Sequence, residues 1–362
     1  MTSRELIENV VRRKSSSGLH PVHFSFADKK TEARAAQGFG MTPEEFRGWL
    51  DNDLKQKYPI EDVQYISMAG TDYEMAKKLG FARPSPLDNA MVDRFGCTWS
   101  IDCIGQELRA GCLEDIEDVY DYEFPSPDHP DSLWGVKEWI EDCHSKGYAT
   151  VVHQNHNIFE RSWAMLGYED LLTACYTDVE SVEYLLDKLT EIKMRMAERI
   201  CELKPTLAHT GDDFGLQTGG VMSLELWRKL FKPRYEKIWG VYKKHGIPVL
   251  HHSCGDCSMY LEDMIEIGLN MLNPVQQSAM DIRMISERFG DSLSFFGSID
   301  TINTLIKGTP DDVRRNVDFT LETLGRNNGL LLSMLNVMPE TPFENIKAAV
   351  EAMMQYRGKS KT

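Results

Sequence analysis

The sequence predicts a single (β/α)8 barrel with an irregular insertion after the second strand. Its 362 residues are enough for one large α/β unit. Eight short strand-like segments, centred near residues 22, 64, 151, 208, 250, 272, 295 and 331, alternate with segments of helical period. Polar residues end six of these segments, which is typical of a barrel whose active site is built at the carboxyl ends of its strands.

The first part of the chain holds two of the expected strands, at 20–26 and 62–68, after an amphipathic helix at 3–14. A further helix is expected to begin at Thr42, because Thr42 and Glu45 have capping-box spacing and Pro43 suits the first helical position. Residues 70–135 break into short pieces rich in glycine, proline and aspartate, with too many aromatic residues for a disordered segment. We expect them to form an insertion that packs on the barrel.

The rest of the chain alternates regularly between helix and strand. Helices are expected at 133–146, 168–203, 224–245, 259–267 and 282–289, then from Thr309 to Leu324 and from Pro342 onward. Strands are expected at 149–154, near 208, and at 248–252, 271–273, 293–296 and 329–333. This pattern predicts that residues 1–362 form one barrel domain, with 70–135 as its insertion.

The charge and composition exclude several classes of partner. The formal net charge is -16, from 56 acidic and 40 basic residues, which disfavours binding to nucleic acid or to an anionic membrane. No apolar run approaches the roughly 18 residues of a membrane span, and the charged N-terminus lacks a signal-peptide core, so we expect a cytoplasmic protein. Eight scattered cysteines indicate no disulfide framework. A homodimer is compatible with this composition.

The segment Gly246–Cys257 is the richest in chemistry. An apolar run from Ile247 to Leu250 leads into His252-Ser253-Cys254, two metal-binding side chains at a strand end. One interpretation is that these residues bind zinc. The other is that they are two buried polar residues whose hydrogen bonds are made by the backbone. Cys257 has Cys-x-x-Cys spacing to Cys254, yet it also suits an apolar-facing position at the start of the next helix.

Other strand ends supply candidates for catalysis and substrate binding. Asp212 and Asp213 could hold a metal, orient a substrate or cap the turn that follows. His153 and His209 are candidates for catalysis, with burial in the core as the alternative. If the strand registers are as expected, the following residues also approach the barrel mouth and could bind substrate: His23, Phe24, His156, Gln217, Gln276 and Asn336.

Several motifs together resemble the uroporphyrinogen decarboxylase superfamily, and more narrowly its corrinoid-dependent methyltransferase branch, which includes methylcobamide:coenzyme M methyltransferases and O-demethylase components. The resemblance is dense over residues 204–350 and looser before them. The motifs are Gly211–Gly220, Met222–Trp227, Lys232–Tyr235, His252–Gly255, Leu272–Gln276, Phe296–Asp300, Gly308–Pro310 and Pro342–Ile346.

The resemblance implies a (β/α)8 barrel and a zinc site. In the zinc methyltransferases a His-x-Cys at this strand end and a later cysteine bind the metal, which carries over to His252 and Cys254. The later cysteine is missing, because Met334 or Ser333 stands at its expected place. A thioether is a poor zinc ligand beside a thiolate. Either Asp212, Asp213 or Cys257 then completes the site, or zinc binding is weak or absent.

Fewer sulfur ligands make zinc a stronger Lewis acid, which suits a methyl ether better than a thiol. The resemblance therefore implies transfer of a methyl group from a small methoxylated, aromatic donor to cob(I)alamin on a separate corrinoid protein. Three alternatives stay open: a coenzyme M-type thiol methyltransferase, a metal-free uroporphyrinogen decarboxylase-like enzyme, and a non-catalytic binding barrel. The decarboxylase is disfavoured because the arginine-bearing motif that the family enzyme carries after its first strand is missing at 24–30.

Overall fold

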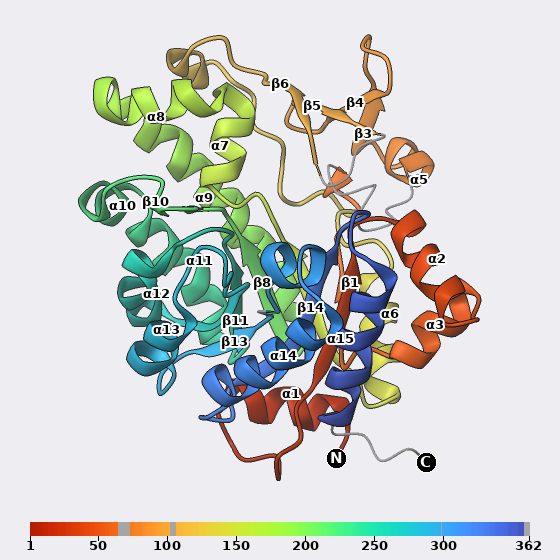
Figure 1. The fold of residues 1–362 in the computed structure, drawn as a ribbon. Coiled ribbons are helices and arrows are strands. Elements are labelled where there is room, and N and C mark those ends of the chain that lie inside the picture. The colour runs from red at the N-terminus through yellow and green to blue at the C-terminus, as the bar shows by residue number, and fades with distance from the viewer. Residues whose placement is uncertain (64–72, 102–105, 298, 358–362) are drawn as a thin grey trace.

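The core of the protein is an eight-stranded parallel sheet that curls almost into a closed barrel (Figure 1). The computed structural model describes residues 1–63, 73–101, 106–297 and 299–357. The strands follow the order β1-β14-β13-β12-β11-β8-β7-β2, with every neighbouring pair parallel. They are β1 (Val22–Phe26), β2 (Leu54–Lys57), β7 (Ala149–Gln154), β8 (Leu207–Gly211), β11 (Val249–His252), β12 (Leu269–Asn273), β13 (Ser294–Phe296) and β14 (Leu330–Val337). The predicted (β/α)8 barrel is confirmed.

The second barrel strand lies elsewhere than predicted. β2 is Leu54–Lys57, which pairs with β7 from Leu54 opposite Ala149 to Lys57 opposite Val152. Most of the predicted strand at 62–68 falls outside the described residues, and its first two residues, Asp62 and Val63, are not in a strand. The sequence of β2 is Leu-Lys-Gln-Lys, with one apolar residue, so hydrophobicity alone does not reveal it.

Helices cover the outside of the barrel (Figure 1). The larger ones are α1 (Ser3–Val11), α2 (Lys29–Gly38), α3 (Pro43–Leu50), α6 (Val136–Ser145), α7 (Phe159–Leu166), α8 (Tyr168–Thr177), α9 (Val179–Glu202), α10 (Leu224–Leu230), α11 (Lys232–Lys244), α12 (Leu261–Ile267), α13 (Ile282–Phe289), α14 (Pro310–Leu324) and α15 (Phe343–Gln355). The capping boxes predicted at Thr42 and Thr309 are both present. The expected helix at 168–203 is divided at Asp178, whose side chain caps α9, and that at 224–245 is divided at Phe231.

A small antiparallel sheet lies between β2 and β7 in the chain and, in Figure 1, beyond the mouth of the barrel. It contains β3 (Ala82–Pro84), β4 (Ala90–Asp93), β5 (Thr98–Ser100) and β6 (Leu108–Ala110), between α5 (Tyr73–Lys78) and a 3-10 helix, η2 (Ile116–Tyr120). A buried ion pair, Arg161 Nη1 to Asp93 Oδ2 at 2.6 Å, joins this sheet to α7. The limits of the insertion, 70–135, stay a prediction.

The described residues also form a hairpin of β9 (Gly215–Leu216) and β10 (Gly219–Gly220), a 3-10 turn η3 (Ser258–Tyr260), and a π-helical turn η4 (Thr301–Ile306). None of the helices in the described part of the chain is long and apolar enough to cross a membrane.

The barrel interior is layered, and this layering positions the functional site. An apolar layer near the amino ends of the strands packs against Ile7, Val10 and Val11 of α1. Its members from the strands include Leu54, Val151, Leu207, Leu250 and Met271. Because side chains alternate along a strand, the next inward positions lie two residues further on. They carry Gln56, His153, His209, His252 and Asn273, all of which line a cavity.

Candidate metal and substrate site

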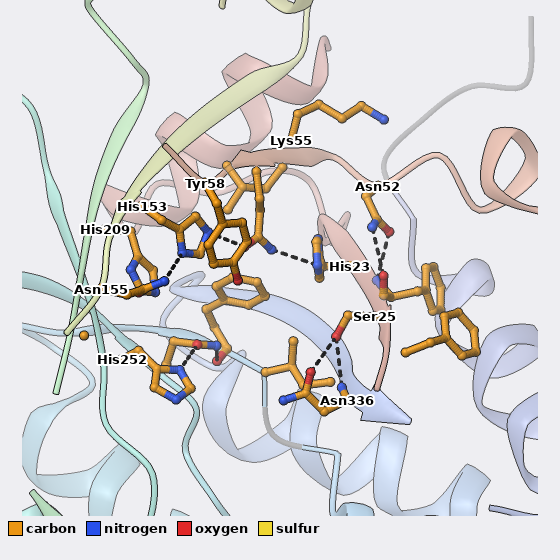
Figure 2. Close-up of a pocket in the computed structure, with 18 of the residues that line it drawn as sticks. His23, Ser25, Asn52, Lys55, Tyr58, His153, Asn155, His209, His252 and Asn336 are labelled. Carbon is orange, nitrogen blue, oxygen red and sulfur yellow. Dashed lines mark hydrogen bonds between the residues drawn. The ribbon is translucent and has the colours of Figure 1, made fainter. Parts of the chain in front are cut away.

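The cavity opens at the carboxyl ends of the strands and has a volume of about 720 Å³. Figure 2 shows side chains from β1, β2, β7, β8, β11 and β14 converging on it. The predicted site residues that line it are His23, Phe24, His153, His209, Asp213, His252, Cys254 and Asn336. A cavity of this size, with polar groups on aromatic and aliphatic walls, suits a small organic molecule.

Asp213, His252 and Cys254 form a candidate metal site in this cavity. One ligand atom from each residue lies within 4.8 Å of the others. His252 Nε2 is 3.3 Å from Cys254 Sγ and 3.7 Å from Asp213 Oδ1. A carboxylate oxygen, an imidazole nitrogen and a thiolate are all ordinary zinc ligands, and three protein ligands leave a coordination position for a substrate. The donor set therefore fits zinc.

Hydrogen bonds around the cluster hold its ligand atoms in place. Asn273 donates from Nδ2 to the carbonyl oxygen of Phe296 at 2.9 Å, which turns its Oδ1 toward His252 Nδ1 at 2.7 Å. The Nδ1 proton of His252 is thereby fixed, and Nε2 is the ring atom directed at Cys254 and Asp213, so it is the atom that would bind a metal. The Cys254 amide donates to Asp213 Oδ1 at 2.7 Å, which orients the carboxylate.

The electrostatics of the cluster favour a cation. Burial opposes a positive charge on His252, but Cys254, Asp213 and the hydrogen bond to Asn273 outweigh it and raise the pKa of His252 to about 10. The neighbouring anionic groups thus create a local potential that stabilises positive charge. A bound zinc ion would use the same potential.

Asp212 and Cys257, which the sequence offered as further ligands, do not join this cluster. Asp212 is fully buried and turned toward α7, where it accepts hydrogen bonds from four backbone amides and from the Tyr235 hydroxyl. Cys257 is also fully buried, and burial raises the pKa of its thiol to about 12. His251 points into the helix layer, beside the rings of Tyr235 and Trp239.

Three of the predicted substrate-binding residues are not among the described residues that line the cavity. His156 is fully buried, and its Nε2 contacts Gln106 Oε1 at 2.5 Å. Gln217 is exposed on the β9–β10 hairpin. Gln276 accepts a hydrogen bond from the Gly255 amide at 2.9 Å, so it supports the turn after the cluster. His156 is directed instead at Gln106, and Gln217 lies on the exposed hairpin, so neither is among the described residues that line the cavity.

Met334 and Ser333, at the place of the expected distal cysteine, are both fully buried in β14. Met334 pairs with Phe24 and Ser333 with His23 in the parallel ladder. Neither is among the described residues of the cavity lining. Asp213, which the sequence offered both as a ligand and as a catalytic residue, is the third member of the candidate metal site. Its catalytic role stays a prediction.

A column of stacked rings runs from the cluster to the opposite wall of the cavity. The ring of His153 lies 3.9 Å from that of Tyr58 and 4.0 Å from that of His209, and His209 lies 6.2 Å from His252 (Figure 2). The two central histidines are neighbours because β7 and β8 pair with His153 opposite His209. Burial lowers the pKa of His153 to about 3 and that of His209 well below its ordinary value. Both rings are therefore neutral near pH 7.

Glu160 is a cavity residue that sequence reasoning missed. It is nine-tenths buried at the start of α7, and its amide donates to Asp212 Oδ1 at 2.9 Å. Burial raises the pKa of its carboxyl well above the ordinary value, and the charges of Asp213 and Asp212 raise it further. Its place in a Phe-Glu-Arg-Ser helix start gave no sign that it faces the cavity.

Gln56, Tyr58 and Asn155 were also missed. Gln56 belongs to the polar strand β2, and Tyr58 follows that strand. Asn155 follows β7 directly and donates from Nδ2 to His153 Nδ1 at 3.4 Å. Correct identification of β2 would have placed Gln56 inside the barrel, two residues after the apolar Leu54.

We expect the stability of the protein to fall as pH decreases from 7 to 4. Burial lowers the pKa of His23 and of His153 to about 3, whereas both take up protons near pH 6.5 in the unfolded chain. Between these values the unfolded state binds more protons, so the free energy of unfolding rises with pH, by about 1.4 kcal/mol per pH unit for each histidine. Urea unfolding at pH 7, 6 and 5 measures this slope.

The His23→Asn variant isolates one of these contributions. Its stability is expected to depend on pH less steeply than that of the wild type, by about 1.4 kcal/mol per pH unit. An identical slope in both proteins would show that His23 is not held neutral in the folded state.

Comparisons of the sequence with a family model and with individual proteins point to the same family. The family model described as uroporphyrinogen decarboxylase (URO-D) matches residues 159–356. A methylcobamide:CoM methyltransferase of Methanosarcina barkeri is 27% identical over 174 residues, 48% of this chain and 49% of the relative. A uroporphyrinogen decarboxylase of Thermus thermophilus is 27% identical over 173 residues, 47% of this chain and 48% of the relative. The chain spans about half the length of the curated relatives it matches.

A solved structure shares the fold over the whole chain. A methyltransferase from Methanosarcina mazei aligns with 98% of this chain and 99% of its own, with a TM-score of 0.66 and 17% sequence identity. At 17% identity this structural similarity supports the barrel fold alone. The match to the family model covers β8, β11, β12 and their loops, and so includes Asp213, His252 and Cys254.

Proposed function

Because the chain belongs to the uroporphyrinogen decarboxylase family, we propose that it is a zinc-dependent methyltransferase that acts with a corrinoid protein. The observation that carries this proposal is the cluster of Asp213, His252 and Cys254 at the carboxyl ends of the barrel strands. The names of two relatives, a methylcobamide:CoM methyltransferase and a methylated-thiol:coenzyme M methyltransferase, support the reaction class.

The proposed donor is a small methoxylated aromatic molecule. Zinc held by Asp213, His252 and Cys254 would act as a Lewis acid on the ether oxygen. With one thiolate among three ligands, this site donates less electron density than a site with several thiolates, and this favours ether activation over thiol activation. Phe24, Tyr58 and Phe296 give the cavity aromatic walls for the ring of the donor.

In the proposed reaction the methyl carbon leaves the ether oxygen and bonds to cobalt. The reduced corrinoid of the partner supplies both electrons of the new bond. The ether oxygen keeps the electron pair of the broken C–O bond and takes up one proton, which gives a hydroxyl group. The chain orients the donor between its aromatic walls, and the raised pKa of Glu160 lets this carboxyl hold a proton at the edge of the cavity.

Methylation of a thiol is a second candidate, which the names of the relatives favour. Uroporphyrinogen decarboxylation is a weaker one, although one relative bears that name. Its substrate has eight carboxylates, and among the described lining residues the basic side chains are Arg47 and Lys55. Arg47 pairs with Glu32 at 2.7 Å, and Lys55 pairs with Asp51 at 3.1 Å. A non-catalytic binding barrel is the remaining alternative. The absence of any reaction with the substrates tested below would favour it.

The test combines the zinc-loaded protein with a cob(I)alamin carrier and a panel of methoxyaromatics, methylated thiols and methylamines. Appearance of the methylcobalamin spectrum with a methoxyaromatic is the expected result. Metal analysis should find about one zinc per chain. Formation of a methylated thiol from methylcobalamin, without reaction of any ether, would show that the donor is wrong and the thiol alternative right.

A further inference from the structure

Two cysteines, Cys97 and Cys112, lie next to each other in the small antiparallel sheet that Figure 1 shows beyond the mouth of the barrel. Strands β5 and β6 pair with Thr98 opposite Ala110. Cys97 precedes Thr98, and Cys112 follows two residues after Ala110, so both cysteines are at the same end of this antiparallel ladder. A Cβ atom added to Gly96 would lie 3.1 Å from the Cβ atom of Cys112. The two segments that carry the thiols are therefore in contact.

The two thiol groups also contact each other. A side-chain hydrogen bond joins them, in which the S–H group of Cys97 donates to the sulfur of Cys112. Both cysteines are free. A disulfide needs Cα atoms about 4.4–6.8 Å apart and Cβ atoms about 3.5–4.5 Å apart, a spacing that facing residues of adjacent segments can meet. The pair can therefore form an S–S bond by a small movement of the sulfur atoms.

The surroundings of the two thiols give them different reactivity. Cys97 is fully buried, whereas Cys112 is partly exposed. The hydrogen bond from Cys97, together with the positive charge of Arg161, lowers the pKa of Cys112 although burial opposes this. The same hydrogen bond and burial raise the pKa of Cys97 well above its ordinary value. Because the thiolate is the nucleophile, Cys112 is the thiol that reacts first with an oxidant from solvent.

Contacts with α7 hold both cysteines in this arrangement. The Cys97 amide donates to Asp93 Oδ1 at 3.0 Å, and the other oxygen of Asp93 pairs with Arg161 of α7 at 2.6 Å. The Cys112 amide donates to the carbonyl oxygen of Met165, also in α7, at 2.8 Å. Each cysteine is thus fixed to the same helix. A buried thiol held beside a more accessible thiolate is the arrangement in which a second cysteine captures an oxidised first one.

We propose that Cys97 and Cys112 form a reversible oxidation site, which a peroxide converts into a disulfide. The Cys112 thiolate attacks one peroxide oxygen and becomes a sulfenic acid, while the O–O bond breaks and the released hydroxide takes a proton from solvent. The sulfur of Cys97 then bonds to the Cys112 sulfur and displaces hydroxide, which leaves as water with the Cys97 proton. Two electrons pass from the sulfurs to the peroxide oxygens, and hydrogen peroxide yields two molecules of water. This site is independent of the proposed methyl transfer.

Peptide mapping of the whole protein tests the assignment. The reduced protein is freed of reductant and treated with hydrogen peroxide, its remaining thiols are alkylated, and it is cleaved with trypsin. Cleavage after Arg94, Arg109 and Lys137 separates Cys97 from Cys112. The expected result is a cross-link between peptides 95–109 and 110–137 that dithiothreitol reverses, with fragment ions that assign it to Cys97 and Cys112. Absence of this cross-link, or a cross-link through Cys103 of the first peptide, would overturn the proposal.

Three variants establish the roles of the two sulfurs. Cys97→Ser keeps the attacking thiol and should lose the cross-link, with Cys112 trapped by dimedone as its sulfenic acid. Cys112→Ser should lose both the cross-link and the dimedone adduct. Cys175→Ser, which removes a buried thiol of α8 whose pKa burial raises to about 11, is the matched control and should form the wild-type cross-link. A dimedone adduct at Cys97 in Cys112→Ser, with none at Cys112 in Cys97→Ser, would refute Cys112 as the attacking thiol.

Discussion

Replacing His252 by alanine is expected to weaken zinc binding more than 100-fold and to abolish methyl transfer. His252 supplies one of three ligand atoms of the cluster, and its Nδ1 is held by Asn273 at 2.7 Å. Loss of an outer partner alone typically lowers metal affinity about 10- to 100-fold, so loss of the ligand itself should cost more. Zinc content after dialysis against a graded chelator measures the change, and the methylcobalamin spectrum measures activity.

Two further variants make this prediction specific. Asn273→Ala keeps all three ligands and should lower zinc affinity by about 10- to 100-fold. His245→Ala, which removes an exposed histidine after α11, should leave zinc binding unchanged. If His252→Ala holds zinc as tightly as the wild type, the metal does not bind at this cluster.

Asp212→Ala is expected to destabilise the protein by about 3 to 5 kcal/mol, or to prevent folding. The Asp212 carboxylate accepts from the amides of residues 157–160 at 2.8–3.0 Å and from the Tyr235 hydroxyl. Without it these buried donors at the start of α7 lose their partner, and each unpaired group costs about 1 to 3 kcal/mol before relaxation. Urea unfolding measures the loss of stability.

The adjacent Asp213→Ala variant is the matched control. Asp213 is partly exposed in the cavity, and its backbone partner is the Cys254 amide. Its replacement should change the free energy of unfolding of the metal-free protein by less than about 1 kcal/mol and should weaken zinc binding. Similar stabilities for the two alanine variants would contradict a structural role for Asp212. The more conservative Asp212→Asn variant keeps the comparison measurable if Asp212→Ala does not fold.

The sequence predicted the barrel and the His252–Cys254 pair because both depend on local patterns. Alternating strands and helices identify the fold, and a strand that ends in His-x-Cys places two ligands on one side of the strand. The third candidate ligand was harder to predict, because Asp212 and Asp213 both follow β8 and their chemistry does not distinguish them. Which of the two lies at the candidate metal site depends on the start of α7, where four backbone amides need an acceptor. Asp212 accepts their hydrogen bonds, and Asp213 is left at the cavity.

The missed residues have a different cause. Gln56 lies in a strand with two lysines, and a sequence of this kind is typical of an exposed segment rather than of a barrel strand. Its identification depends on pairing with β7, a contact between segments almost a hundred residues apart. The backbone amide of Glu160 donates to Asp212, so the position of Glu160 at the start of α7 also depends on a tertiary interaction. The expected substrate residues His156 and Gln217 lie beyond their strand ends, where alternation no longer predicts orientation.

The two layers inside the barrel differ in what they allow a protein engineer to change. The apolar layer against α1 stabilises the fold, and the layer two residues further along the strands forms the cavity wall. A slip of one residue in any strand would exchange inward and outward side chains in both layers together. Substitutions at positions 56, 153 and 209 can therefore alter ligand preference while leaving the apolar layer in place. Insertions or deletions within these strands would damage folding and binding at once.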